Sequence, residues 1–301
     1  MTKSRGVADW GHYPPVNNNI LINPNFTVTQ RGAVINHDNY SYGPDRWAFR
    51  GRDLVGGTRL QSTTDYSSGI NKMVVEHDGA ASYASAYQHI ETVNLLGLYG
   101  KELTFSFSYS DTGGSGVPYV SASSFNSSDI AKTLFNTVPT SLGNNRWTCT
   151  FTLSTSDGTL PGLSARGIQV AMHPNKQNTA PDKWSVWETK LEAGSAATPF
   201  IARSYGEERA LCQRYYYTTG GFQIYYTAAS YMLGGTSSTS VADIWYPVTM
   251  RTTPSLLPYT TSQLSAKSEV ITSTRARLNA NASDQDRCAK VESPLIFDAE
   301  L

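Results

Sequence analysis

The chain has 301 residues and a formal net charge of zero, from 24 basic and 24 acidic residues, and only 16% of its residues are charged. Soluble domains usually carry about 25% charged residues, and no segment of this chain forms a basic stripe, so nucleic-acid binding through phosphates is not expected. No apolar run reaches the roughly 18 residues of a membrane-spanning helix, so membrane insertion is not expected either.

The first fifteen residues, MTKSRGVADWGHYPP, lack the apolar segment of a secretory signal. The three cysteines, Cys149, Cys212 and Cys288, are odd in number and far apart, which does not indicate a disulfide framework. We therefore expect a protein assembled in a reducing cytoplasm. Cys149 alternates with polar residues on an apolar strand face, and this pattern predicts a buried thiol.

Residues 1–19 are too short and irregular to bury a core of their own, and they predict an extended arm. Terminal disorder is the alternative, because chain ends fray by default. Trp10 favours docking, since a large apolar side chain costs free energy when it stays in water. We expect Trp10, Tyr13 and Pro14 to attach the arm to a partner protein.

Residues 20–203 predict a β-sandwich. Pro24 interrupts residues 20–27, which suggests an edge strand or a bulge. A polar, aromatic loop is expected over Val28–Gly32 and Asp38–Trp47. The strands that follow are expected at residues 72–76, 83–90, 102–109, 147–153, 168–172 and 184–191.

Strict alternation over 102–109, 147–153 and 168–172 predicts strands with one face on a core and one face in water. Threonine and serine fill the expected wet face of the first two. With turn signals and no helical period between them, these strands predict an all-β, antiparallel jelly-roll sandwich.

A hinge follows the sandwich. Ala196 to Phe200 are expected to turn the chain outward, and residues 204–217 to form a short helix. Ser204 followed by Glu207 has the spacing of a capping box. Glu207 and Glu208 suit the positive end of the helix dipole, and Arg214 suits the other end.

Residues 204–301 predict this helix plus a small C-terminal β domain. Strands are expected at 222–233, 241–250 and 268–279, with a flexible loop at 234–240. The terminal PLIFDAEL contains Leu295, Ile296 and Phe297, which need a partner strand. The β part, roughly 85 residues long, is small enough that self-association would supply missing core.

Motifs of catalysis and metal binding are missing from the sequence. It contains no HxxxH, CxxC, GxSxG, Walker or dinucleotide-binding glycine pattern, so we expect no metal, no cofactor and no catalytic residue. Glu188 and Glu192 would stand about 13 Å apart on one strand, too far for glycoside hydrolysis, and a solvated strand end is expected there. The sequence leaves open whether a structural calcium site is present, because it contains no pattern of calcium ligands. Clusters of tyrosine, of which there are 18, indicate a surface that suits sugars or proteins.

Four segments carry a resemblance to a known family. WSVWETKLEAGSAATPFIARSYGEERALCQRYY at 184–216 is similar to a run that recurs in bacteriophage tail-fibre and minor virion structural proteins. NILINPNFTVTQRG followed by YGPDRW at 42–47 resembles the opening of the same module. YPVTMRTTPSL at 246–256 and the final DAEL resemble its end.

The resemblance implies a homotrimeric virion protein with a jelly roll similar to carbohydrate-binding modules, located on the virion surface. It also implies a scaffold at the domain junction, made of Glu192, Pro199, Phe200, Arg203, Glu208, Cys212, Arg214, Tyr215 and Tyr216. No receptor site is carried over from the family, because sugar binding inferred from a fold alone is analogy.

The sequence thus leads to a first hypothesis, a tail-fibre or adhesion protein. It would attach to other virion proteins (of tail, collar or capsid) by its arm and contact a host-surface glycan. A non-enzymatic capsid or collar decoration protein without receptor binding is the alternative, since collagen-like repeats and coiled-coil heptads are missing from the sequence. A glycan hydrolase is the third hypothesis, for which we expect no turnover.

Overall fold

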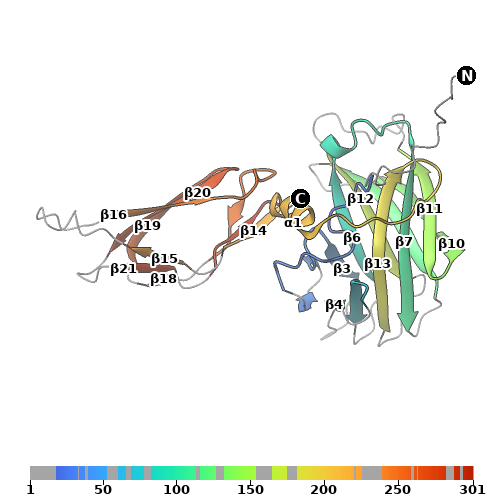
Figure 1. The fold of residues 1–301 in the computed structure, drawn as a ribbon, viewed down its shortest axis with the longest axis horizontal. Helices are drawn as coiled ribbons and strands as arrows, with labels where there is room; N and C mark the ends of the chain where they lie inside the picture. Colours follow the sequence, from blue (N-terminus) through green and yellow to red (C-terminus); the bar gives the residue numbers. More distant parts are fainter. Residues whose placement is uncertain are drawn as a thin grey trace, which may run out of the picture.

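The structure is a computed structural model of the full chain. It describes residues 18–32, 34–37, 40–52, 60–65, 69–77, 83–112, 116–126, 132–153, 165–174, 182–219, 222–225, 239–258, 261–262, 264–282, 288–291 and 294–300. All strand pairs within these ranges are antiparallel. Figure 1 shows a broad sandwich, a slender second unit extending from it, and one helix between them.

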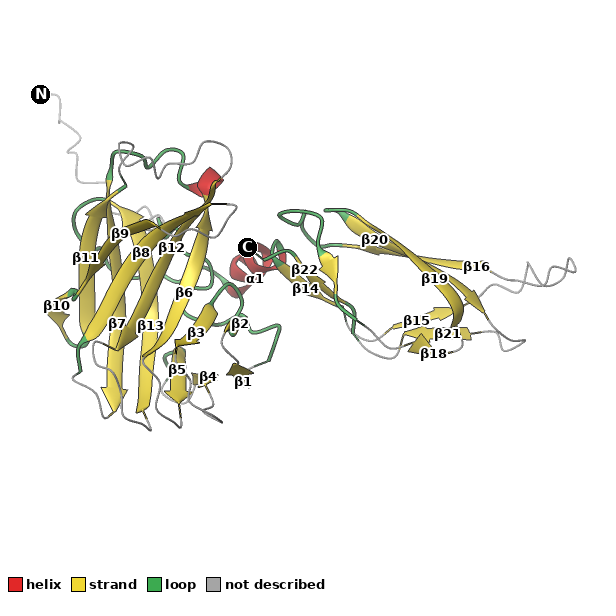
Figure 2. Ribbon diagram, turned by 180° about the vertical axis from the view of Figure 1, so that it is seen from behind, coloured by secondary structure: helices red, strands yellow, loops and turns green. Residues whose placement is uncertain are grey.

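The sandwich is a jelly roll of two packed sheets, as the alternation predicts (Figure 2). The seven-stranded sheet has the order β1 (Val34–His37), β4 (Leu60–Asp65), β5 (Lys72–His77), β13 (Asp182–Ala193), β7 (Glu102–Thr112), β11 (Arg146–Thr152) and β10 (Thr140–Gly143). The six-stranded sheet has the order β2 (Tyr40–Tyr42), β3 (Ala48–Arg52), β6 (Tyr83–Glu91), β12 (Ala165–Pro174), β8 (Pro118–Asn126) and β9 (Lys132–Thr137). A short 3-10 helix, Thr92–Asn94, follows β6.

The inward side chains of both sheets form the core. Phe105 and Phe107 of β7 meet Val170 and Met172 of β12, and Trp184 of β13 is fully buried with them. Each large apolar side chain that leaves water here contributes roughly 1.5–3 kcal/mol of burial free energy. This core fixes the two sheets and therefore fixes which residues face outward.

The structure corrects the predicted wet face of β7. Thr104 and Ser106 are buried. The Thr104 hydroxyl donates a hydrogen bond to the Gly194 carbonyl oxygen at 2.6 Å, and the Arg146 guanidinium donates to Ser106 Oγ at 2.7 Å. The end of β13 and the Arg146 side chain therefore cover this part of the sheet.

Residues 20–27 form no strand, contrary to the prediction. They make a turn in which Asn23 and Phe26 adopt positive φ angles of 54° and 57°. Repeated left-handed residues cannot continue a pleated strand. The predicted loop at Asp38–Trp47 is also partly wrong, because it contains β2.

Helix α1 (Tyr205–Gln213) confirms the predicted helix start and shortens its end. The prediction extended the helix to residue 217, but Tyr216–Thr218 form β14. This strand pairs with β22 (Ile296–Asp298), the partner that the C-terminal apolar residues were expected to need. β17 (Ser255–Leu256) completes this three-stranded sheet.

The remainder of the C-terminal unit consists of two further three-stranded sheets. One contains β15 (Phe222–Tyr225), β21 (Cys288–Val291) and β18 (Thr261–Ser262), and the other contains β16 (Thr239–Trp245), β20 (Arg275–Ala282) and β19 (Leu264–Ile271). Its core consists of Tyr246, Met250, Ala276, Leu278, Leu295, Phe297 and Ala299. The last residues return to α1, beside which the C-terminus lies in Figures 1 and 2.

Two predicted C-terminal strands have different limits in the structure. Residues 268–279 are not one strand, because Thr272–Thr274 turn the chain between β19 and β20. Thr272 Oγ1 accepts hydrogen bonds from the backbone N–H groups of Thr274 and Arg275, which stabilises this turn. β16 ends at Trp245, so residues 246–250 are not strand, and Tyr246 and Met250 enter the core instead.

Residues 226–238 lie outside the described residues. They include most of the predicted strand at 222–233 and of the predicted loop at 234–240. Cys149 is half-buried rather than buried, and burial raises the pKa of its thiol to about 12. No helix among the described residues is both long and apolar enough to cross a membrane.

Candidate functional site

The N-terminus of α1 is fixed by its own side chains. Ser204 Oγ accepts a hydrogen bond from the Glu207 N–H at 3.3 Å, and Glu207 Oε2 accepts one from the Ser204 N–H at 3.0 Å. This reciprocal pair is a capping box, which satisfies two backbone donors that the helix leaves unpaired. Hydrogen bonds from Ser204 also lower the pKa of Glu207. The predicted capping box is confirmed.

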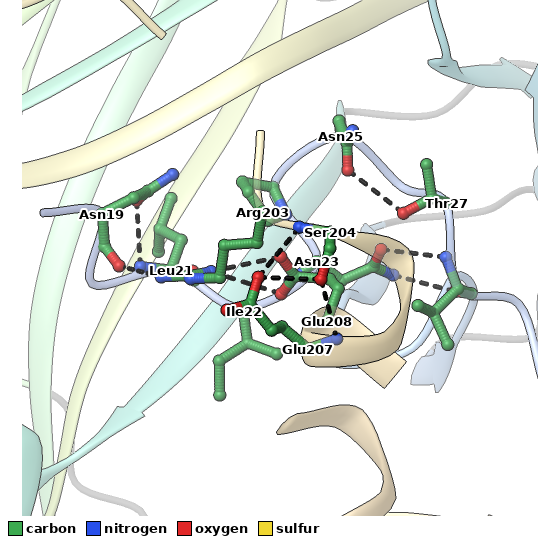
Figure 3. Close-up of polar contacts among 12 residues, drawn as sticks. Asn19, Leu21, Ile22, Asn23, Asn25, Thr27, Arg203, Ser204, Glu207 and Glu208 are labelled. Carbon is green, nitrogen blue, oxygen red and sulfur yellow. Dashed lines mark hydrogen bonds and ion pairs between the residues drawn. The ribbon is translucent and has the colours of Figure 1, made fainter. Parts of the chain in front are cut away.

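Arg203 and Glu208 dock this helix on the turn at residues 19–23 (Figure 3). The Arg203 guanidinium donates to the carbonyl oxygens of Leu21, at 2.9 Å, and Asn19. Glu208 Oε1 accepts the backbone N–H of Asn23 and lies 3.3 Å from Arg203 Nη1. Because Glu208 is buried, its charge is stable only with such partners.

Asn23 is the centre of the turn. Its side-chain amide donates to the carbonyl oxygens of Val28 and Asp45, at 2.8 and 2.9 Å, and its Oδ1 accepts the Val28 N–H at 3.0 Å. Its carbonyl oxygen accepts the indole N–H of Trp47 at 2.9 Å. Asn tolerates the left-handed φ of 54° better than most residues do. Asn23 therefore joins the turn to the start of the six-stranded sheet.

An apolar layer lies between α1 and the turn. Cys212 and Tyr215 pack against Ile22 and Val28, and all four side chains are buried. Burial raises the pKa of the Cys212 thiol well above its ordinary value. Cys212 is therefore a neutral packing residue rather than a reactive thiolate.

The other predicted scaffold residues belong to a neighbouring polar group. Glu192 is buried, contrary to the expected solvated strand end, and it forms an ion pair with Lys190 at 3.1 Å. It also accepts hydrogen bonds from the Thr198 N–H and from Asn18 Nδ2, both at 2.8 Å. Burial raises the pKa of Glu192, but the hydrogen bonds from Thr198, Lys190 and Asn18 outweigh it and lower the pKa overall.

Lys190 Nζ also donates to the Pro199 carbonyl oxygen at 3.1 Å, which ties the hinge segment to β13. Phe200 is half-buried at the end of this segment. The structure thus places Glu192 and Pro199 around Lys190, and Arg203, Glu208, Cys212 and Tyr215 around the turn at residues 19–28. The latter group joins the sandwich to the C-terminal unit.

A set of ion pairs extends this joint to the end of the chain. We call it the junction charge cluster, and its members are Arg31, Asp45, Arg46, Glu91, Arg214, Arg251, Asp298 and Glu300. Glu91 of β6 lies 3.4 Å from Arg214 and 3.6 Å from Arg251. Arg31 lies 3.5 Å from Glu300 and 3.6 Å from Asp298. Charged side chains of the sandwich therefore form ion pairs with β22 and the residues that follow it.

Two arginines of the cluster also lie on tyrosine rings. The Arg31 guanidinium carbon is 3.6 Å from the ring centre of Tyr216, and that of Arg46 is 3.6 Å from the ring centre of Tyr215. Cation–π contacts that are shielded from water contribute about 2 kcal/mol. The tandem tyrosines after α1 therefore act as platforms for charges from the sandwich.

Asp45 has an unusual environment within this cluster. Its side chain is fully buried, and its oxygens accept the backbone N–H of Gln30 at 2.9 Å and the side-chain amide of Gln30. Burial raises the pKa of Asp45 to about 6, against the opposing effects of Arg31 and Gln30. The carboxylate is ionised at neutral pH at a cost in folding free energy.

We expect this cost to appear as a pH dependence that Asp45→Asn removes. Because the folded pKa of about 6 exceeds the unfolded value of about 3.9, the folded chain binds the extra proton between these values. The contribution of Asp45 to the free energy of unfolding therefore falls by about 2 kcal/mol as the pH rises from about 4 to about 7. Urea unfolding across this range measures it. Glu192→Gln is the control of opposite sign, because the pKa of Glu192 is lowered.

A second group of side chains lies on the outward face of the six-stranded sheet. Ala86 and Ile90 of β6 and Val170 and Met172 of β12 face the core, so their neighbours along each strand face outward. We call these outward residues the outer aromatic face, and they comprise Tyr42, Tyr87, His89, Tyr119, Gln169 and His173.

Strand register sets the order of these side chains. Tyr87 of β6 pairs with Ala48 of β3 and Ala171 of β12, and the three pack in one buried cluster with Tyr42. His89 pairs with Gln169, and His89 Nε2 lies 3.2 Å from Gln169 Oε1. The apolar cluster is therefore bordered by polar planar groups.

His173 and Tyr119 border the cluster on its other side. They pair across β12 and β8, and their rings lie 5.2 Å apart. His173 Nδ1 donates to the Pro174 carbonyl oxygen at 2.7 Å, so the neutral ring carries its proton on Nδ1 and has Nε2 as its acceptor nitrogen. Burial lowers the pKa of His173, which favours this neutral form.

The sequence contains a signal for this face that the motif search missed. Tyr87 and His89 alternate along the predicted strand at 83–90, and Gln169 and Ala171 alternate along the one at 168–172, with His173 directly after it. Each strand therefore places these residues on one face, but only the pairing of β6 with β12 brings the two sets together. That pairing joins segments about eighty residues apart.

Among the described residues, no group of three His, Cys, Asp or Glu side chains could hold a metal ion. Glu188 lies at a bulge of β13 with a φ of 52°, and both oxygens of Glu192 accept hydrogen bonds from Thr198. The predicted arm residues Trp10, Tyr13 and Pro14 lie outside the described residues.

No protein-family model and no curated protein matches the sequence. Among solved structures, the enzymatically active domain of tailspike protein 4 from bacteriophage CBA120 matches 59% of this chain with 10% identity and a TM-score of 0.34, and the match spans only 22% of that chain.

Two sugar-related structures are similar to a comparable extent. The C-terminal family 22 carbohydrate-binding module of Clostridium thermocellum Xyn10B matches 54% of this chain and 97% of its own, with 11% identity and a TM-score of 0.35. A putative sugar binding protein from Bacteroides thetaiotaomicron matches 58% of this chain and 100% of its own, with 13% identity and a TM-score of 0.35. Similarities this low assign neither family nor ligand to this chain.

Proposed function

We propose that this chain is a non-enzymatic virion protein of a bacteriophage that contacts a host-surface glycan through the outer aromatic face. The observation that carries the glycan part is the arrangement of Tyr119, His173, His89 and Gln169 around the apolar cluster of Tyr87. Aromatic rings pack against the apolar face of a sugar ring, and amide and imidazole groups match its hydroxyl groups.

The virion part of the proposal rests on the sequence resemblance at residues 19–47, 184–217 and 246–256. Residues 1–19 are the proposed attachment arm, and a homotrimer on the virion surface is the proposed assembly. The junction charge cluster supports such a role, because it would hold the sandwich and the C-terminal unit in a fixed relation while the particle attaches.

The test is binding of the purified chain to host-surface polysaccharide, measured by calorimetry. We expect Tyr119→Ala and Gln169→Ala to weaken binding at least about tenfold each, which is 1.4 kcal/mol. The matched control is Thr152→Ala, an exposed residue of β11 in the opposite sheet, which should bind like the natural chain. Equal binding by all three variants would show that the outer aromatic face is not the contact.

A decoration protein without receptor binding is the second candidate, favoured by the lack of a long shaft in the sequence. Competition distinguishes the two functions. Saturating amounts of an adhesion protein reduce the adsorption of particles to host cells, whereas a decoration protein leaves adsorption unchanged.

A further inference from the structure

The sheet of β16, β20 and β19 has one face on the core of the C-terminal unit and one face turned away from it. Ala276 and Leu278 of β20 are buried in that core, and Ala242 and Ile244 of β16 pack against it. The residues between them therefore face outward. We call these outward residues the Trp245 face, and they comprise Asp243, Trp245, Val270, Arg275 and Arg277.

This face exposes large apolar side chains. Trp245 is 64% exposed and Val270 is 54% exposed. Register places Trp245 opposite Arg275, and Arg277 between Asp243 and Val270. An indole ring that remains in water forgoes a large burial free energy, so the exposed apolar side chains on this strand face mark a contact surface.

The charged residues of the face are held in place beside the indole. Arg277 binds Asp243 with two hydrogen bonds of 2.8 Å, and Arg275 lies 3.6 Å from the same carboxylate. The Arg275 guanidinium carbon lies 5.3 Å from the Trp245 ring centre. Tryptophan and arginine are the residues most enriched at the centre of protein interfaces.

We propose that the Trp245 face is the contact between copies of this chain. The proposal rests on the homotrimer proposed above: both signs of charge lie within the patch, so around a three-fold axis each copy can place its Asp243 against the arginines of the next copy. A uniformly acidic partner would instead meet Asp243, and a uniformly basic one would meet Arg275 and Arg277. This charge complementarity between identical patches selects a second copy as the occupant.

The thin C-terminal unit supports the same occupant. Among the described residues it has three sheets of three strands each, and its core contains seven buried side chains, two of which are the small alanines Ala276 and Ala299. Small units of this kind gain stability from association, because the contact buries apolar surface that the single chain leaves in water. Trp245 and Val270 supply such surface.

Sedimentation velocity of the full chain over a range of concentrations tests the proposal. We expect the natural chain to associate and Trp245→Ala to weaken association at least about tenfold. Leu142→Ala is the control, because Leu142 is also exposed, at 55%, but lies on β10 of the sandwich. Circular dichroism of each variant verifies that the chain is folded.

Charge reversal gives a second, independent measurement. Asp243→Arg should abolish association, because it gathers three arginines on each face, and the double variant Asp243→Arg, Arg277→Asp should restore it.

A natural chain that stays monomeric at all concentrations would overturn the proposal, as would unchanged association in Trp245→Ala. A monomer that loses polysaccharide binding through Trp245→Ala would identify the face as a glycan platform and would also overturn it. The state of association does not bear on the outer aromatic face, which is tested by its own variants.

Discussion

Replacing Arg46 by methionine should lower the free energy of unfolding by about 3–5 kcal/mol, because it breaks a buried ion pair by removing one partner. The Arg46 side chain is 1% exposed and that of Glu300 is 4% exposed. The guanidinium contacts Glu300 directly, donates to the His89 carbonyl oxygen at 2.5 Å and lies on the ring of Tyr215. Methionine keeps the apolar stem of the side chain and loses all three contacts.

A double-mutant cycle separates the pair from the burial of each charge. Glu300→Gln alone removes the acidic partner, and the double variant removes both charges. We expect the double variant to be more stable than Arg46→Met, because Arg46→Met leaves the buried Glu300 carboxylate with Arg31 alone, at 3.5 Å, and the double variant removes that carboxylate. Urea unfolding followed by tryptophan fluorescence measures all four chains, since Trp47, next to Arg46, is fully buried.

The matched control is Lys183→Met, which breaks the ion pair with Glu76. Its two side chains are 52% and 44% exposed, and exposed pairs contribute at most about 1 kcal/mol. If Arg46→Met costs no more than Lys183→Met, the junction charge cluster does not stabilise the joint between the sandwich and the C-terminal unit.

Local patterns in the sequence predict much of the fold. The capping box of Ser204 and Glu207 involves residues three apart, so its spacing alone identifies where α1 begins. The alternation over 102–109, 147–153 and 168–172 is equally local, and β7, β11 and β12 cover these residues except Leu153. Such signals predict which residues face a core without knowledge of the partner strand.

The errors arise where distant residues decide the outcome. Thr104 is buried because Gly194, ninety residues later, returns to accept its hydroxyl. Helix α1 ends early because Tyr216 pairs with Asp298. No pattern within a few residues of Thr104 or Tyr216 contains this information, and propensity yields to tertiary contacts in both places.

In the candidate sites too, the sequence predicts what local patterns determine and misses what distant contacts determine. The hinge motif identifies Arg203 and Glu208, but not their partners in the turn at residues 19–23. The turn that presents those partners contains left-handed φ angles at Asn23 and Phe26, and neither residue requires that conformation by its type. The outer aromatic face needs the register of β6 with β12, which only the assembled sheet supplies.

Gly167→Ala should lower the free energy of unfolding by about 4 kcal/mol, a cost that only severe strain or a steric clash reaches. Gly167 has a φ of 135°, and a Cβ there would lie 1.8 Å from the backbone oxygen of Ile90. A backbone oxygen cannot rotate away as a flexible side chain can. β12 would therefore have to separate from β6 where Gly167 pairs with Glu91.

Gly194→Ala is the matched control for this prediction. Gly194 also has a positive φ, 123°, but a Cβ there would meet nothing within 4 Å. It should therefore cost only the strain of the backbone angle, about 1–3 kcal/mol. The difference between the two variants in urea unfolding isolates the clash with Ile90.

Because Gly167 pairs with Glu91, two residues from His89, the same displacement should separate His89 from Gln169 and weaken polysaccharide binding before the chain unfolds. Equal stability of the two alanine variants would mean that β6 and β12 tolerate this separation, and that their close approach does not fix the outer aromatic face.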